Sequence, residues 1–356
     1  LSHEINGLAD KKVFVVIWTT TPWTIPANLA IAIHPDIIYA AVDTKNGEVL
    51  ILAKELVGDC MKTFGFSDFS ILAEIKADAL ERKKCRHPLY DRESLIIIGS
   101  HVTIEAGTGC VHTAPGHGRE DYEVGLLYDL DAYSPVDENG CFTQEADLFS
   151  GQFVFEANSN IVAHLHKNGA LIAHEKMEHS YPHCWRCKKP VIFRATPQWF
   201  ISMDKTGLRK NALKEIDKVT WIPHWGKERI YGMIENRPDW CVSRQRAWGV
   251  PIAIFYCEKC NEMYLNSDII DHIYTLFEEN GADIWFEKNV EELLPEDAVC
   301  KTCGNKAFIK EDDILDVWFD SGVSHAAVLE QRSNLKWPAD LYLEGSDQHR
   351  GWFHSS

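Results

Sequence analysis

Apolar positions in the N-terminal part of the chain fall into short runs, a pattern typical of a protein rich in β-strands. Residues 13–18 (VFVVIW) are continuously apolar over one strand length, which predicts a buried strand. The runs at 37–43 and 48–53 predict two further strands, and the Asn-Gly pair between them supplies the positive φ angles of a tight hairpin turn. Residues 94–107 continue the strand signal and end in glycine. We therefore expect hairpins and short strands here.

Two segments carry a helical signal instead. Residues 119–130 (REDYEVGLLYDL) place acidic side chains in a first helical turn, where they offset the positive end of the helix dipole. Residues 156–169 predict a second helix. Many short strands with few helices indicate an α+β or mainly β fold, with a β-barrel-like domain over residues 1–178.

The pattern changes after residue 178. Residues 179–310 combine C-x-x-C pairs, tryptophans and arginines, which predicts an irregular connecting region clipped by a metal ion. Residues 311–356 carry strand-like runs at 314–319 and 340–343, followed by a glycine-containing loop. Ligand-binding loops of α/β sheets follow strands in this way, so the segment predicts a truncated Rossmann-type α/β remnant.

Composition narrows the class of protein. Hydrophobic residues make up 45% of the chain, but no run of eighteen apolar residues occurs, so we expect no membrane contact. Residues 1–4 have neither the basic start nor the apolar stretch of a signal peptide, and the chain does not begin with Met. These features predict a cytoplasmic monomer and suggest that the chain is a piece of a longer one.

The net charge of −17 argues against a nucleic-acid partner, because proteins that hold nucleic acid usually present a basic face. A local basic patch stays open, since residues 237–246 (RPDWCVSRQR) contain three arginines. Motifs must therefore decide whether nucleic acid is a partner.

Six of the eleven cysteines fall in C-x-x-C pairs, and eleven are too few for a disulfide scaffold in a chain of 356 residues. Two pairs, Cys257 with Cys260 and Cys300 with Cys303, offer the four thiolates of a tetrahedral zinc site. The alternative is two unrelated buried pairs, which their polar flanking residues disfavour. The third pair, Cys184 with Cys187, has no partner pair nearby, so its thiols are either idle or half of a site.

Two further segments could form a small-ligand site. The threonine run 19–21 ends the first predicted strand, where three hydroxyls can hydrogen bond into a cleft, although β-branched residues also simply end strands. Residues 107–118 are rich in glycine and enclose His112 and His117, with Asp121 close behind. The alternatives are a core histidine, a turn residue and an acid at a helix start, so these residues alone leave the function open.

Seven segments together resemble the isoleucyl branch of the class I aminoacyl-tRNA synthetases, in the order of that family. The threonine run is specific, because valyl and leucyl relatives carry Arg-Pro and an acidic residue there. The matching segments are 18–28 (WTTTPWTIPAN), 107–122 (GTGCVHTAPGHGREDY), 179–187 (HSYPHCWRC), 195–200 (ATPQWF), 237–251 (RPDWCVSRQRAWGVP), 316–322 (DVWFDSG) and 342–353 (YLEGSDQHRGWF).

The resemblance implies that residues 1–178 are the editing insertion of such an enzyme. This family is the standard example of limited discrimination between amino-acid substrates. An apolar pocket favours one substrate over another that differs by one methylene by only roughly 10–200-fold. A second site then hydrolyses tRNA mischarged with valine. The family pattern assigns the catalytic part to Thr20, His112 and Asp121, with His112 limiting the pocket and Asp121 holding the α-ammonium group. Thr19, Thr21 and Asn28 would bind the substrate.

The resemblance also implies contacts to an aminoacyl-adenylate and to metal. The adenylate residues would be Glu344, Gly345, Asp347, Gln348, Trp318 and Trp352. Zinc would bind the four-cysteine set, and Cys184 and Cys187 would be half of a second site whose other pair lies upstream of this chain. The parent enzyme would use ATP, isoleucine and its tRNA, but this chain lacks the HIGH-type and KMSKS-type elements, so synthesis is not expected from it.

Two rival functions remain open at this point. A stand-alone trans-editing hydrolase would not need the loop at 344–352. A non-enzymatic, zinc-stapled tRNA-binding module would bind valyl-tRNA without turning it over. Deacylation of valyl-tRNA that depends on Asp121 would separate editing from simple binding.

Overall fold

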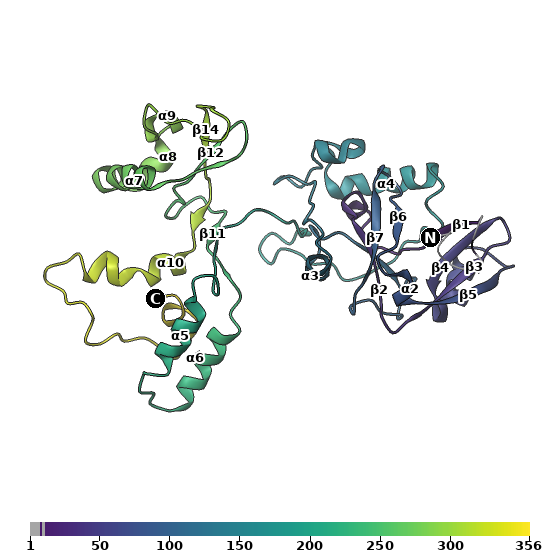
Figure 1. Ribbon diagram of the computed structural model, residues 1–356, viewed down its shortest axis with the longest axis horizontal. Helices are drawn as coiled ribbons and strands as arrows, with labels where there is room; N and C mark the ends of the chain where they lie inside the picture. Colours follow the sequence, from purple (N-terminus) through teal and green to yellow (C-terminus); the bar gives the residue numbers. More distant parts are fainter. Residues whose placement is uncertain (1–7, 9–10) are drawn as a thin grey trace. The chain divides into compact units, whose positions relative to one another are not determined.

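The computed structural model describes Leu8 and residues 11–356, which form two compact units that divide between Thr196 and Pro197 (Figure 1). Residues 1–4, from which we inferred the lack of a signal peptide, lie outside the described part. Among the described helices none has both the length and the apolar character needed to cross a membrane.

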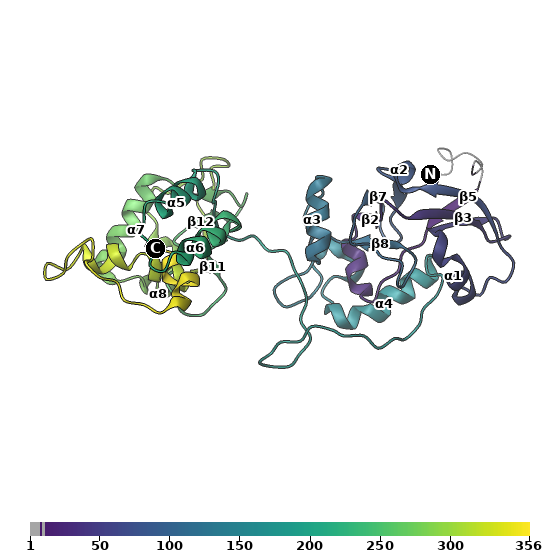
Figure 2. The ribbon, with the colours of Figure 1, turned by 90° about the horizontal axis from the view of Figure 1, so that it is seen from below.

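The first unit contains two mixed four-stranded sheets (Figure 2). The first has the order β1 (Lys12–Val15), β4 (Glu48–Ala53), β3 (Ile38–Asp43), β5 (Ser70–Lys76). The second has the order β6 (Lys84–Arg86), β7 (Glu93–Ile98), β2 (Ala30–Ile33), β8 (Cys110–Thr113). In each sheet one pair of strands is parallel, β1 with β4 and β2 with β7, and the other pairs are antiparallel.

The predicted hairpin is confirmed by β3 and β4, whose central residues are buried. In its turn the positive φ angles fall on Lys45 and Gly47 rather than on Asn46. The first predicted strand is confirmed as β1 but ends at Val15 and alternates between exposed and half-buried residues. The expectation of a buried strand is wrong here because β1, among the strands that the structure describes, lies at the edge of its sheet and pairs only with β4.

The mixed α+β character is confirmed, but the barrel-like arrangement is not. The two sheets are joined by an isolated parallel bridge between Trp18, just after β1, and Val111 in β8. Among the described residues β5 and β6, the outer strands at the other ends, are not paired with each other. Hairpin patterning predicts strands and their immediate neighbours, whereas closure depends on how far distant strands curl toward one another.

Several helices pack beside the strands of the first unit. Both predicted helices are confirmed, as α3 (Arg119–Leu127) and α4 (Val154–Lys167). One stripe of α4 packs its aliphatic residues on Trp23 and Ile25 in the 3₁₀ helix η1, and each buried aliphatic side chain contributes about 1.5–3 kcal/mol. The remaining elements are η1 (Pro22–Ala27), η2 (Lys54–Leu56), α1 (Val57–Thr63), α2 (Ala77–Leu80) and η3 (Gln144–Phe149).

The second unit has three small antiparallel sheets and several helices. The sheets pair β9 (Phe200–Ile201) with β10 (Trp240–Cys241), β11 (Ser243–Arg244) with β15 (Ile314–Leu315), and β12 (Phe255–Cys257) with both β13 (Met263–Tyr264) and β14 (Phe308–Lys310). Helices α5 (Leu208–Ile216) and α6 (Trp225–Glu235) pack side by side (Figures 1 and 2). The other helices are α7 (Ser267–Asn280), α8 (Ile284–Glu287), α9 (Val290–Leu293), α10 (Val317–Gly322), the π-helix η4 (His325–Leu329), η5 (Ser346–Arg350) and η6 (Trp352–His354).

Both strands expected in the C-terminal segment need correction, and a Rossmann-type sheet is not confirmed. The run 314–319 is a strand only at β15, because Asp316 caps a helix by accepting a hydrogen bond from the Trp318 N–H at 2.8 Å. Residues 340–343 form no strand. They pair with no other strand among the described residues, and an unpaired strand would leave its backbone N–H and C=O groups without partners.

Candidate functional site

A chain of hydrogen bonds in the first unit joins most of the residues predicted for the editing pocket. The Thr19 hydroxyl lies 3.3 Å from the Thr21 hydroxyl. The Thr21 hydroxyl in turn lies 3.4 Å from the Thr24 hydroxyl. The Thr24 hydroxyl lies 2.7 Å from Nε2 of His112. The short helix η1 carries Thr24 and β8 carries His112, so two segments far apart in sequence meet here.

His112 continues this chain through its other ring nitrogen. Nδ1 lies 3.1 Å from the Asn28 amide nitrogen, which also donates to the Ala30 carbonyl at 2.8 Å. The Asn28 amide oxygen accepts from the Ser94 hydroxyl at 2.5 Å. The antiparallel pairing of β2 with β8, and the parallel pairing of β2 with β7, bring these residues together.

These contacts determine where the proton sits on the imidazole. An amide nitrogen only donates, so Nδ1 of His112 accepts, and the single proton lies on Nε2. Nε2 therefore donates to the Thr24 hydroxyl, which donates to the Thr21 carbonyl at 2.9 Å. Burial lowers the pKa of His112 to about 4, and a second proton would face the Asn28 donor. His112 is thus a neutral, fixed wall at pH 7, suited to shaping a pocket rather than to exchanging protons.

Asp121 lies at the carboxyl end of the strand that carries His112. Its carboxylate accepts a hydrogen bond from the N–H of Ala114, the residue that follows β8, at 2.9 Å. Burial raises the pKa of Asp121, an effect that this hydrogen bond opposes. Asp121 also stands in the first turn of α3, where the helix dipole favours a negative charge. A partly buried carboxylate of this kind can bind a cationic group.

The predicted residues do not all meet in this network. The Thr20 side chain is exposed, and its hydroxyl makes no hydrogen bond to any described residue. Thr24 and Ser94, which sequence reasoning missed, are buried and bind directly to His112 and Asn28. Their only sequence signal is that Thr24 belongs to the same motif as the threonine run, because pairing between distant strands sets their positions.

A second histidine from the same glycine-rich segment packs on an aromatic ring next to this network. The ring of His117 contacts Trp23 edge-on, with 4.9 Å between ring centroids. Its Nδ1 donates to the Phe193 carbonyl at 2.9 Å, because a carbonyl oxygen only accepts. Burial lowers the pKa of His117, so this ring is also neutral at pH 7.

The four cysteines predicted as zinc ligands converge in the second unit. Their sulfur atoms all lie within 4.8 Å of one another, with Cys257 and Cys303 3.5 Å apart and Cys260 and Cys300 3.6 Å apart. Zinc–sulfur bonds of about 2.3 Å in a tetrahedron place the sulfur atoms about 3.8 Å apart, so the donor set fits such an ion. The backbone N–H of Cys303 lowers the pKa of Cys300, which favours the thiolate that a metal binds.

All three C-x-x-C pairs form the same local turn. The residue after the second cysteine has a positive φ angle in each, at Lys188, Asn261 and Gly304, and donates its N–H to the carbonyl of the first cysteine at 2.8 Å. The Cys184 pair therefore has the shape of a metal knuckle. Among the described residues no third ligand joins it, since the four-cysteine set is the one group of suitable side chains.

Part of the predicted adenylate site also assembles. The Gln348 side-chain oxygen accepts from the Trp352 N–H at 3.0 Å, and the Trp352 indole donates to the Ser321 carbonyl in α10 at 3.0 Å. A β-carbon at Gly351 would lie 2.2 Å from that Gln348 oxygen and 2.7 Å from the Trp318 ring, so both side chains flank this glycine. Glu344, Gly345 and Asp347 are exposed; Glu344 and Gly345 directly precede η5, and Asp347 lies in its first turn.

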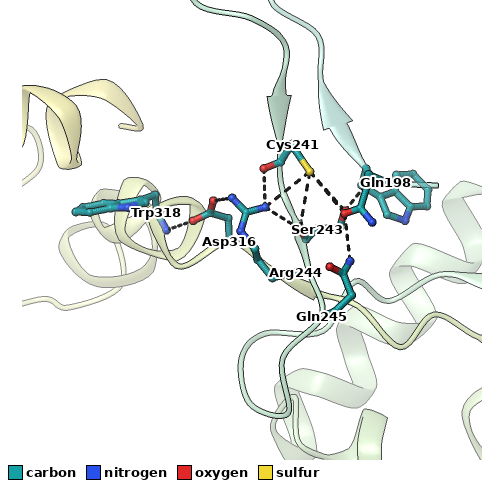
Figure 3. Close-up of polar contacts among 8 residues, drawn as sticks. Gln198, Cys241, Ser243, Arg244, Gln245, Asp316 and Trp318 are labelled. Carbon is teal, nitrogen blue, oxygen red and sulfur yellow. Dashed lines mark hydrogen bonds and ion pairs between the residues drawn. The ribbon is translucent and has the colours of Figure 1, made fainter. Parts of the chain in front are cut away.

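A polar network holds β11 and α10 together (Figure 3). Arg244 forms an ion pair with Asp316, whose side chain is 6% exposed, and donates to the carbonyl oxygens of Cys241 and Ser243. The Ser243 hydroxyl donates to the Gln198 amide oxygen at 2.8 Å. These residues belong to three of the motifs quoted above, yet sequence reasoning gave them no role.

Residues 6–356 match the family profile described as tRNA synthetases class I (I, L, M and V), so the chain belongs to that family. Among its curated relatives, the isoleucine–tRNA ligase of Syntrophotalea carbinolica is 58% identical over the whole chain and 38% of the relative's length. The isoleucine–tRNA ligase of Geobacter sulfurreducens is 59% identical over the whole chain and 39% of its own length. The chain thus spans less than two fifths of these relatives.

Two solved structures match part of this chain at low identity. One, described as GlLeuRS-CP1, matches with a TM-score of 0.39 and 18% identity over 48% of this chain and 87% of its own. The P. knowlesi cytosolic leucyl-tRNA synthetase editing domain matches with a TM-score of 0.36 and 13% identity, over 46% of this chain and 84% of its own.

Proposed function

We propose that this chain carries the editing site of an isoleucine–tRNA ligase and hydrolyses the ester bond of valyl-tRNA. The parent enzyme would join isoleucine to its tRNA with ATP. The proposal is supported by family membership, by relatives that are isoleucine–tRNA ligases, and by the network around His112.

The observation that carries the proposal is the joint position of His112 and Asp121 at one end of β8. The Asp121 carboxylate would hold the α-ammonium group of the bound amino acid through a charge-assisted hydrogen bond. His112, clamped between Thr24 and Asn28, would limit the room for the side chain, so that valine enters and isoleucine does not.

The reaction adds water to the ester and releases free valine and the ribose hydroxyl of the tRNA. The ester is already activated, so holding a water molecule near its carbonyl carbon supplies much of the catalysis without a protein nucleophile. The hydroxyls of Thr19, Thr20 and Thr21 are candidates for orienting substrate and water, and that of Thr20 is exposed and bonded to no described residue.

The second unit would supply a structural metal site and part of the adenylate site. Cys257, Cys260, Cys300 and Cys303 would hold zinc, which would fasten the loops on either side of α7 to α9. The cluster of Trp318, Gln348 and Trp352 would face the aminoacyl-adenylate in the parent enzyme. Because all four ligands of the metal would be protein thiolates, its role would be structural rather than catalytic.

Deacylation of purified valyl-tRNA by this chain tests the proposal. We expect turnover of valyl-tRNA and little of isoleucyl-tRNA, and a roughly 10–100-fold lower rate for Asp121→Ala, the loss expected for one charge-assisted hydrogen bond. Glu120→Ala is the matched control, because Glu120 is an exposed acid on the same helical turn. Binding of valyl-tRNA without turnover would overturn the proposal and favour a tRNA-binding module.

A further inference from the structure

Two side chains from the connection between β6 and β7 hold the C-terminal end of η1. Nε2 of His87 lies 3.0 Å from the Ile25 carbonyl oxygen. Nη2 of Arg92 lies 3.5 Å from that ring nitrogen and donates to the Pro26 carbonyl. Carbonyl groups at the end of a helix lack partners of their own within the helix, so side-chain donors from elsewhere can fix them in place. We call His87 and Arg92 together the η1 brace.

The donor of His87 is set by the backbone around it. Nδ1 accepts hydrogen bonds from the N–H groups of Leu89 and Tyr90, both at 3.1 Å, so it carries no proton. Burial lowers the pKa of His87 to about 4, and the ring therefore has one proton at pH 7, on Nε2. Because a carbonyl oxygen only accepts, this proton is donated to Ile25. His87 thus offers η1 one donor in one orientation.

Aromatic rings hold the plane of Arg92. Its guanidinium lies over the rings of Tyr90 and Tyr133, 5.2 and 5.1 Å from their centroids. The Arg92 carbonyl accepts from the His87 N–H at 2.9 Å, which joins the two residues of the brace through the backbone as well. Both donors are therefore fixed before they meet η1.

The brace holds the segment that supports the pocket wall. Thr24 in η1 accepts from Nε2 of His112, and Asn28, the residue after η1, donates to Nδ1 of the same ring. The Asn28 N–H also donates, at 2.9 Å, to the Ile25 carbonyl, the oxygen that accepts from His87. A shift of this end of η1 would therefore alter both hydrogen bonds to His112.

We propose that His87 and Arg92 are positioning residues for the candidate editing site, which set the room beside His112 by holding η1. Neither has to touch the substrate, because each acts through a backbone carbonyl of η1. A misplacement of about 1 Å that originates away from the reacting atoms can cost roughly 100-fold in rate. The brace therefore affects selection between side chains that differ by one methylene, an inference that rests on the proposed function.

Two substitutions of His87 separate the two sides of its ring. Asparagine places its amide near the position of Nδ1 and still accepts from the backbone, but it is too short to reach Ile25. Glutamine places its amide nitrogen near the position of Nε2 and keeps the donor to Ile25. His87→Asn should therefore release η1, whereas His87→Gln should retain it. Arg92→Met keeps the unbranched stem of the arginine and removes every donor, so it should also release η1.

Deacylation by the whole chain measures selection, as the kcat/KM for valyl-tRNA divided by that for isoleucyl-tRNA. His87→Asn and Arg92→Met should each lower this ratio roughly three- to tenfold, the range expected for one lost hydrogen bond. His87→Gln should keep it within about twofold. A merely structural role would instead lower kcat/KM for both substrates to the same extent. An unchanged ratio in His87→Asn and Arg92→Met, or equal losses in His87→Asn and His87→Gln, would overturn the proposal.

Thr44→Val is the matched control. It removes a buried hydroxyl that donates to the Glu48 carbonyl at 2.9 Å, in the β3–β4 hairpin rather than at η1. Its loss should lower stability and leave the ratio unchanged. A fall of the ratio in this variant equal to that in His87→Asn would show that any loss of stability loosens selection, and would overturn the brace. Far-ultraviolet circular dichroism confirms that each variant folds.

A second measurement does not depend on editing. NMR of the chain with ¹⁵N-labelled histidine follows the Nε2 proton of His112, which is buried and bonded to Thr24 and should exchange slowly with water. Exchange should quicken in His87→Asn and Arg92→Met, but not in His87→Gln or Thr44→Val. Equal exchange in all four variants would overturn the brace. Absence of valyl-tRNA turnover by the unaltered chain, with the expected exchange, would overturn the proposed function and leave the brace.

Discussion

The hydrogen bonds around His112 in the candidate editing site require one tautomer of its imidazole, with the proton on Nε2. One nitrogen donates to Thr24 and the other accepts from Asn28, so replacing either partner leaves a buried ring nitrogen unsatisfied. A buried polar group without a partner costs about 1–3 kcal/mol. The same contacts that hold the ring in place therefore also stabilise the unit.

Thr24→Val tests this dependence, because valine keeps the shape of threonine and removes only the hydroxyl. We expect it to lower the free energy of unfolding by about 1–3 kcal/mol in urea titrations and to loosen selection against isoleucyl-tRNA. Thr20→Val is the control: its exposed hydroxyl has no described partner, so stability should change by no more than about 0.5 kcal/mol. Equal effects of the two variants would contradict the assigned hydrogen bond.

Two buried histidines make the first unit sensitive to acid. Burial lowers the pKa of both His87 and His112 to about 4, whereas the unfolded chain keeps the ordinary value of about 6.5. Between these values the unfolded state binds protons that the folded state does not. Stability is therefore full above pH 6.5 and falls as the pH drops toward 4, by about 2 kcal/mol per histidine at pH 5. Asp121, with its raised pKa, acts in the opposite sense.

Hydrogen exchange, corrected for intrinsic rates, measures this loss at β2 and β8 in the whole chain. Protection there should be clearly lower at pH 5 than at pH 7. Replacing both histidines by glutamine should reduce the dependence of protection on pH in this window, even if the starting stability is lower; His117, whose pKa burial also lowers, remains. Unchanged protection of the unaltered chain would show that these rings are accessible to protons in the folded state.

At the scale of elements, the two sheets of the first unit meet at a glycine. Gly109 has a φ angle of +72°, and a β-carbon there would lie 2.4 Å from the β-carbon of Ala53 at the end of β4. Around this contact the Ala53 N–H donates to the Thr108 carbonyl, and the Tyr39 hydroxyl donates to the Gly109 carbonyl. The close approach lets β8, which carries His112, start directly against the first sheet.

Gly109→Ala should therefore destabilise the chain by about 2–4 kcal/mol, from the strained φ angle and the steric overlap together. Gly47→Ala is the matched control, since Gly47 also has a positive φ angle but a β-carbon there meets nothing within 4 Å. Its cost should stay near 1 kcal/mol. Urea unfolding of both variants measures the difference, and similar losses would argue against a tight contact at Gly109.

At the scale of the whole molecule, the two units depend on different forces. The first has apolar clusters between and beside its sheets, whereas one cluster of the second includes three of the four cysteines, with Phe255 and Trp285 fully buried. Sheets of two or three short strands are marginal on their own. A metal ion that joins their loops would then contribute a large share of the stability of the second unit.

Removal of metal tests this division. A chelator should unfold α7 to α9 first and leave the first unit intact, because structural zinc sites contribute on the order of 10 kcal/mol in small domains. Native mass spectrometry should show that zinc is lost as α7 to α9 unfold. Cys257→Ser should likewise unfold these helices without a chelator. Cys184→Ser is the control, since Cys184 has no described third ligand. Equal stability with and without chelator would contradict a structural metal.

Features that depend on neighbours along the chain were predictable from the sequence. The β3–β4 hairpin, helices α3 and α4 and the cysteine knuckles all follow from local spacing, because turns and helices form between residues a few positions apart. The motifs also indicated the family before any contact was known. In the candidate site, His112 and Asp121 are close in sequence: His112 lies in β8, and Asp121 lies in the first turn of α3, the next helix.

Contacts between distant segments were decided only by the tertiary structure. Thr24 and Ser94 bind the residues around His112 because β2 pairs with both β7 and β8, a register that no local pattern specifies. Asp316 caps α10 locally, but its ion pair with Arg244, far away in sequence, exists only in the assembled fold. Local spacing determines which helix, strand or turn a short segment can form. Its burial and its partners depend on which distant segments pack against it, so only the tertiary structure shows that Thr24 and Asn28 hold His112 in place.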